Sequence, residues 1–264
     1  MLAEAYDFKD ESEALYNLIK PLSEAEYDKV TLFRDWTIND VLQHLHYFNY
    51  VADLTLSDED AFVQTYTELK GLQEKSGSLV EATDEMLKGL KGIALRDAWH
   101  DYYHSMADRF YAADPKQRLK WVGPSMSARS SISARLMETW SHAQEIYDLL
   151  GTERQNEDRI KSIAVMGINT FGWTFKNREE PIPENVPHVR LKAPSGAIWE
   201  WNDNNSADLI EGDAAEFCQV VTQTRNIADT SLKVTGEIAT RWMAVAQCFA
   251  GPARTPPAAG TRHA

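Results

Sequence analysis

The fold of this chain is decided by the stretch WTINDVLQHLHYFNYVA at residues 36–52. Its apolar residues recur at the spacing of one helix face, which predicts an amphipathic helix that begins at Thr37. The Thr37 side chain can cap the first turn, and Asp40, three residues later, favours the positive end of the helix. The apolar stripe consists of Ile38, Val41, Leu42, Leu45, Phe48 and Ala52.

Further helices are expected on both sides of this stretch, because similar apolar stripes recur there. Residues 57–92 are partly helical, but their four glycines leave the structure of that segment open. Four principal helices joined by polar loops indicate a helix bundle over residues 1–178. Besides the helix at 37–52, the principal helices are predicted near residues 95–113, 127–150 and 156–175, and a shorter helix is predicted at 8–20.

The pattern changes after the proline-rich segment EEPIPENVPH, which we expect to be a linker. HVRLKA and AIWEWN predict two strands joined by a turn at residues 194–196. ADLIEGDAAEFCQVV is then echoed by SLKVTGEIATRWMAV, and each reads as a strand, a glycine, an acid and a helix. These segments predict a small α+β domain over residues 187–252, followed by a disordered tail at 253–264. The fold class is therefore mainly α, with an α+β C-terminal domain.

The charge balance and the distribution of apolar residues exclude several classes of protein. The chain has 27 Lys and Arg residues against 40 Asp and Glu residues, with no basic patch, so nucleic-acid binding is not expected. No apolar run approaches the ~20 residues needed to cross a bilayer. The N-terminal segment is acidic, unlike a secretory signal peptide, and the two cysteines suggest no disulfide framework. These features predict a cytoplasmic protein.

The best chemical signal is the pair Glu138 and His142 within METWSHAQEIYDLLG. Four residues apart on a helix, the two side chains project from one face, where a carboxylate and an imidazole can bind one divalent metal. The same spacing is common on solvated helix surfaces, and the pair lies off the main apolar stripe, beside Ser131 and Arg135. The pair alone therefore leaves both interpretations open.

Other histidines offer alternatives to this pair. His44 borders the apolar stripe of residues 37–52 and can be a packed side chain or a ligand. His46 lies about 160° from His44 around the helix, so one helix cannot direct both rings to one ion. His100 and His104 form another pair four residues apart. We expect that pair to lie on the surface, and it remains the rival metal pair.

Two motifs in these segments carry a family resemblance. WTxxDVLxHL at residues 36–45, followed by ETWxH at 138–142, resembles the DinB superfamily and, within it, the mycothiol-dependent maleylpyruvate isomerase type. Residues 121–142 and the ending WMAVAQCFAGP are similar to a subgroup of metal-binding proteins whose C-terminal domain resembles sterol-carrier or isomerase modules. The resemblance implies a DinB-like four-helix bundle that holds a divalent metal, usually zinc.

The resemblance also implies which residues form the metal site: His44, Glu138 and His142. Three protein ligands leave one zinc position for water or substrate, which is the catalytic arrangement. Such a centre polarises a carbonyl or lowers the pKa of a bound water or thiol. Arg135, one turn before Glu138, could fix a substrate carboxylate, and a surface ion pair with Glu138 is an alternative of equal weight.

We expect a zinc-dependent enzyme of isomerase or transferase type, in which a metal-activated small thiol attacks a small carbonyl or acyl substrate. A variant that uses bound water would be a hydratase, lyase or hydrolase. The alternative is a non-catalytic protein with a structural metal and an apolar ligand in the C-terminal domain. RNA modification is a remote third function, against which the charge balance argues. The expected partner is a small-molecule substrate, and the expected oligomeric state is a homodimer. If the protein is instead non-catalytic, its apolar ligand would lie in a cavity of the C-terminal domain lined by Trp199, Trp201, Phe217, Val220 and Val221.

Overall fold

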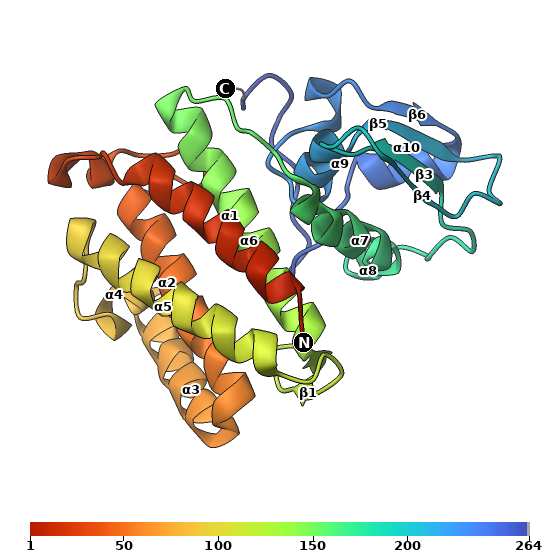
Figure 1. The fold of residues 1–264 in the computed structure, drawn as a ribbon. Coiled ribbons are helices and arrows are strands. Elements are labelled where there is room, and N and C mark those ends of the chain that lie inside the picture. Colours follow the sequence, from red (N-terminus) through yellow and green to blue (C-terminus); the bar gives the residue numbers. More distant parts are fainter. Residues whose placement is uncertain (263–264) are drawn as a thin grey trace. The chain divides into compact units, whose positions relative to one another are not determined.

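The computed structural model describes residues 1–262, and residues 263–264 of the expected tail lie outside the described residues. The chain divides into two compact units, Met1–Leu149 and Leu150–Ala264. The first unit is built almost entirely of helices, and the second combines helices with a four-stranded sheet (Figure 1). The fold is therefore mainly α with an α+β C-terminal part, as the sequence predicts.

A helix bundle forms the first unit. Helix α5 packs against both α1 and α2, and α3 and the short helix α4 pack against α2 (Figure 1). Helix α6 joins through side-chain contacts to α2 and through the Arg129–Glu4 ion pair to α1. The elements are α1 (Glu4–Ile19), the 3-10 helix η1 (Glu24–Asp28), α2 (Ile38–Ser57), α3 (Glu59–Ser76), α4 (Leu79–Met86), α5 (Gly92–Ala112), the strands β1 (Arg118–Leu119) and β2 (Met126–Ser127), and α6 (Ala128–Leu150).

The bundle core is rich in large aromatic side chains. Trp99 and Tyr103 of α5, Trp140 of α6 and Phe8 of α1 are all fully buried. Burial extends around α6 far beyond its apolar stripe and includes Arg135. The face that the sequence pattern leaves for solvent is therefore covered in the folded chain.

The helix expected near 156–175 is broken and belongs to the second unit. It is replaced by η2 (Asp158–Ile160), α7 (Lys161–Asn169) and α8 (Phe171–Lys176), with Thr170 at the break between the last two. In the bundle its place is taken by α1, which packs along α5. Since apolar spacing fixes a helix but not its packing partner, the sequence pattern could not distinguish these two helices.

The sheet of the second unit has the strand order β4-β3-β5-β6. The central strands β3 and β5 are parallel, with Val189 opposite Ile210, and both outer pairs are antiparallel. Both expected strand–glycine–acid–helix segments are present. The elements are β3 (His188–Lys192), β4 (Ile198–Trp201), β5 (Leu209–Asp213), α9 (Ala214–Val221), the 3-10 helix η3 (Ile227–Asp229), β6 (Lys233–Thr235) and α10 (Glu237–Met243).

Residues 253–262, for which the sequence predicts a disordered tail, make hydrogen bonds to earlier residues of the second unit. The Arg254 amide donates to the Gln247 side chain at 2.9 Å, and the Gly260 amide donates to Asp229 at 2.8 Å. The Asn226 side chain donates to the carbonyl of Pro257 at 2.8 Å. Polar side chains of the domain thus satisfy backbone groups of this segment.

Over residues 1–262, none of the helices combines the length and the apolar character that crossing a bilayer requires.

Candidate metal centre

The start of α2 positions the first predicted ligand, His44. Thr37 is the N-cap residue: its hydroxyl accepts a hydrogen bond from the Asp40 amide at 3.1 Å, and Asp40 accepts one from the Thr37 amide at 2.8 Å. This reciprocal pair satisfies two backbone donors that a helix start otherwise leaves open. The helix therefore begins at a fixed residue, and the ring of His44, two turns later, is directed toward α6.

The structure brings His44, Glu138 and His142 together, although 94 residues separate the first two in the sequence. The Glu138 Oε2 atom lies 3.2 Å from Nε2 of His44 and 3.4 Å from Nε2 of His142. The three candidate ligand atoms all lie within 4.8 Å of one another. Ligands at zinc distances of 2.0–2.2 Å in a tetrahedron are about 3.4 Å apart. The donor set and its spacing therefore fit a zinc-type ion.

Aromatic rings surround both imidazoles. The Trp36 ring stacks on His142 with 5.7 Å between centroids and 10° between planes, and Phe33 meets the same ring edge-on at 5.0 Å. Phe48 lies 4.8 Å from the ring of His44. These rings restrict the rotation of the imidazoles and make their surroundings apolar, which strengthens electrostatic interactions within the cluster.

Burial and hydrogen bonding set the charges in the cluster. Desolvation lowers the pKa of His44 to about 4, although the hydrogen bond to Glu138 opposes this shift. Burial by itself would raise the pKa of Glu138, but hydrogen bonds to His142 and His44 outweigh it and hold that pKa well below its ordinary value. At neutral pH the chain thus offers a neutral His44 imidazole and a carboxylate, the protonation states that metal ligands need.

Arg135 is buried, with 3% of its surface exposed, and it is not part of a surface ion pair. Its Nε atom donates to the Asn49 side chain at 2.9 Å, and one terminal nitrogen donates to the carbonyl of Leu45 at 3.4 Å. Burial lowers the pKa of Arg135 to about 10, so it remains charged at neutral pH. Its hydrogen bonds tie α6 to α2 next to His44, and its contact with a substrate stays a prediction.

Within residues 1–262, the other histidines lie apart from this cluster. His46 packs edge-on against Tyr102 of α5 at 5.6 Å, and His188 pairs with Glu200 in the second unit at 2.8 Å. His100 and His104 are half-buried rather than exposed, because they lie against Glu13 of α1. Glu13 carries no signal in the sequence, since its position opposite α5 follows from helix packing alone.

The apolar face proposed for a ligand cavity in the second unit is occupied by the protein itself. Phe217 and Val221 are fully buried, and a Cβ atom at Gly167 of α7 would come within 3.2 Å of both side chains. Trp199 is buried and Trp201 half-buried on β4, with 6.5 Å between ring centroids. The packing of α7 on α9 thus fills the space beside Phe217 and Val221.

Comparison with known proteins adds to this geometry. The family model described as mycothiol maleylpyruvate isomerase N-terminal domain matches residues 8–147. Two proteins of Mycobacterium tuberculosis, the uncharacterized proteins MT0041 (strain CDC 1551 / Oshkosh) and Rv0036c (strain ATCC 25618 / H37Rv), are each 32% identical over 246 residues. The match covers 93% of this chain and 95% of each relative.

Solved structures with the same fold include a crystal structure of the mycothiol-dependent maleylpyruvate isomerase, with a TM-score of 0.53 at 13% sequence identity. A mutant of that enzyme gives a TM-score of 0.52, also at 13% identity. Each match covers 83% of this chain and 87% of the other. At this identity the likeness establishes the fold.

Proposed function

Because the chain belongs to the mycothiol maleylpyruvate isomerase N-terminal domain family, we propose that it is a metal-dependent enzyme of isomerase or transferase type. The proposed substrate is a small carbonyl or acyl compound, and a small thiol is the proposed co-substrate. The observation that carries this proposal is the convergence of His44, Glu138 and His142 within 4.8 Å. A homodimer and a cytoplasmic location remain predictions that accompany it.

The residues that would hold the metal, proposed to be zinc, are His44 on α2 and the Glu138–His142 pair on α6. When bound, the ion supplies a Lewis acid that polarises a carbonyl and lowers the pKa of a coordinated thiol. His44 contributes a neutral imidazole because burial lowers its pKa to about 4. Trp36 and Phe48 pack on the His44 ring, which excludes water from one side of the cluster.

The use of a thiol co-substrate, rather than water, is the most specific element of the proposal. Mycothiol is part of the name of the family, and the solved isomerase with the same fold is described as dependent on it. The donor set by itself is equally suited to activating a water molecule, which would give a hydratase, lyase or hydrolase. We favour the thiol because the match to that family covers the segments that contain all three cluster residues.

Arg135 acts in this proposal as a positioning residue. Its guanidinium donates to Asn49 and to the carbonyl of Leu45, next to His44. The residue thereby fixes α2 relative to α6, and with it the distance between His44 and Glu138. The positive charge one turn from Glu138 also favours the ionised carboxylate.

The proposal is tested by metal content and by thiol-dependent turnover of the full chain without an affinity tag. We expect His142→Ala and Glu138→Gln each to lower the zinc content by one equivalent, measured by elemental analysis. His188→Ala is the matched control, because His188 also pairs with a glutamate but lies in the second unit. A normal zinc content in His142→Ala would refute the ligand assignment. If the two variants lose zinc but the wild type shows no thiol-dependent turnover of maleylpyruvate or acyl thioesters, the metal site stands and the enzymatic function is rejected.

A further inference from the structure

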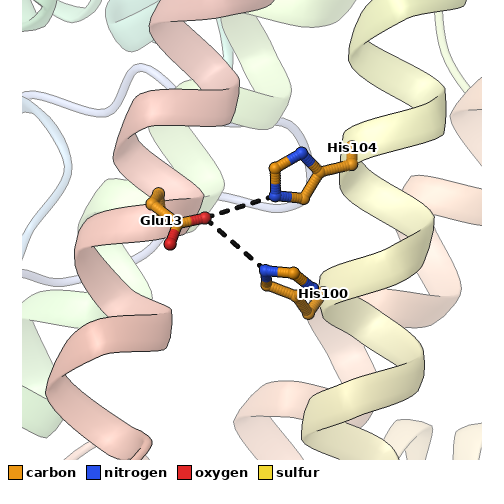
Figure 2. A group of neighbouring side chains, drawn as sticks. All are labelled: Glu13, His100 and His104. Carbon is orange, nitrogen blue, oxygen red and sulfur yellow. Dashed lines mark hydrogen bonds and ion pairs between the residues drawn. The ribbon is translucent and has the colours of Figure 1, made fainter.

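A second cluster of two histidines and one glutamate lies elsewhere in the bundle, between α1 and α5. Figure 2 shows His100 and His104 one turn apart on α5, with both rings directed at Glu13 of α1. Two histidines at positions i and i+4 of a helix project from the same face and can bind one metal. Here the opposite helix adds a carboxylate at the point where the two rings converge.

The distances in this cluster match those of the first cluster. Oε2 of Glu13 lies 3.3 Å from Nε2 of His104 and 3.7 Å from Nε2 of His100. The three candidate ligand atoms again lie within 4.8 Å of one another. Neighbouring ligands of a tetrahedral zinc ion are about 3.4 Å apart, so one ion can reach all three atoms after only small side-chain movements.

Neighbouring aromatic side chains hold these ligands in place. The Tyr103 hydroxyl donates to Oε2 of Glu13 at 2.7 Å, which orients the carboxylate as outer partners of metal ligands do. The ring of Tyr16 lies 4.2 Å from His100, and that of Tyr103 stacks on His104 at 4.8 Å. Since Tyr103 is fully buried, the cluster rests on a fixed part of the bundle.

The charge of the cluster favours a cation. Burial by itself would raise the pKa of Glu13, but the hydrogen bonds from Tyr103 and His104 and the proximity of His100 lower it. The carboxylate is therefore ionised at neutral pH. The net charge of −13 further raises the local concentration of cations around the protein.

We infer that Glu13, His100 and His104 form a second divalent-metal site, specific for borderline transition metals such as Zn²⁺. Two imidazole nitrogens suit zinc, nickel, copper or cobalt, whereas Mg²⁺ and Ca²⁺ require oxygen ligands. All three side chains are 29–39% exposed, whereas the His142 side chain in the first cluster is 9% exposed. The second site therefore exchanges its ion with solvent more readily than the first.

The test is a zinc titration of the full chain, without an affinity tag and after treatment with a chelator, in which calorimetry measures the number of equivalents bound. We expect two equivalents in the wild type, one in His104→Ala, one in His142→Ala, and none in the double variant. Glu13→Gln keeps a hydrogen-bond acceptor for Tyr103 and is expected to lose the second equivalent as well. Asp108→Ala, an exposed acidic residue one turn beyond His104 on α5, is the control and retains both equivalents.

The variants separate this inference from the proposed function. Zinc binding by His142→Ala that disappears on adding His104→Ala supports the second site even if the first site is not a zinc site. One equivalent in the wild type that His104→Ala and Glu13→Gln leave unchanged, with circular dichroism showing folded proteins, would overturn it. Displacement of the second equivalent by millimolar Mg²⁺ would contradict the assigned metal class.

Discussion

We predict that removing the side chain of Asp53, near the C-terminal end of α2, lowers the free energy of unfolding of the bundle. Its carboxylate accepts two hydrogen bonds from Arg109, at 2.9 and 2.6 Å, and one from the Tyr102 hydroxyl at 2.8 Å. Both donors are on α5, so these bonds fasten α2 to α5. Asp53 is 7% exposed, so its carboxylate depends on these donors for the solvation that it loses on folding.

The size of the effect follows from the two kinds of partner. The half-buried Tyr102 hydroxyl donates to a charged acceptor, a bond that contributes about 1.5–3 kcal/mol. The Arg109 side chain is 41% exposed, which limits its ion pair to about 1 kcal/mol or less because water can replace the partner. Asp53→Ala is therefore expected to lower the free energy of unfolding by about 3 kcal/mol.

Urea unfolding followed by circular dichroism at the helix band measures this loss. Double-mutant cycles separate its parts: the coupling of Asp53 with Tyr102, probed by Tyr102→Phe, should exceed its coupling with Arg109, probed by Arg109→Met. Asp108→Ala on the same helix is exposed and should change stability by no more than about 0.5 kcal/mol. A loss below about 1 kcal/mol in Asp53→Ala, or a larger coupling with Arg109, would show that this reasoning is wrong.

Two further predictions concern α2. Burial lowers the pKa of His46 from 6.5 to about 4. Below pH 6.5 the unfolded chain therefore binds a proton that the folded chain binds only near pH 4, and the free energy of unfolding falls across this range by up to roughly 3 kcal/mol. His46→Phe should remove this part of the pH dependence, and parallel urea-midpoint curves for wild type and variant between about pH 7 and 4 would contradict it. Thr37→Ala removes the helix cap seen with Asp40 and should cost about 1 kcal/mol in the same urea assay. Thr37→Ser serves as its control, and an unchanged midpoint in Thr37→Ala would exclude a capping contribution.

The parts of the fold that local chemistry determines could be predicted from the sequence. Thr37 and Asp40 mark the start of α2 because a cap needs only residues three apart. The turn before Ala197 and the strand pair around it follow from a Pro-Ser-Gly segment between two alternating stretches. Gly151, with a φ of 61°, ends the long helix that contains Glu138, as expected for a left-handed cap.

The sequence does not reveal the features that depend on which helices pack against each other. Arg135 lies off the apolar stripe of α6, and only the approach of α2 buries its guanidinium beside Asn49. Glu13 is one of many acidic residues on a polar helix face, and nothing local distinguishes it until α1 packs along α5. The convergence of His44 with Glu138 is implied by the family resemblance, since helical spacing alone is also typical of a solvated Glu138.

The division of the chain at residue 150 has a consequence for biosynthesis. Every side chain of both histidine–glutamate clusters comes before that residue, and the first unit is continuous in sequence. Domains generally fold as units during translation, beginning with the N-terminal one. The bundle can therefore fold on the ribosome, with the residues of both clusters already brought together, while the β-sheet half is still being translated.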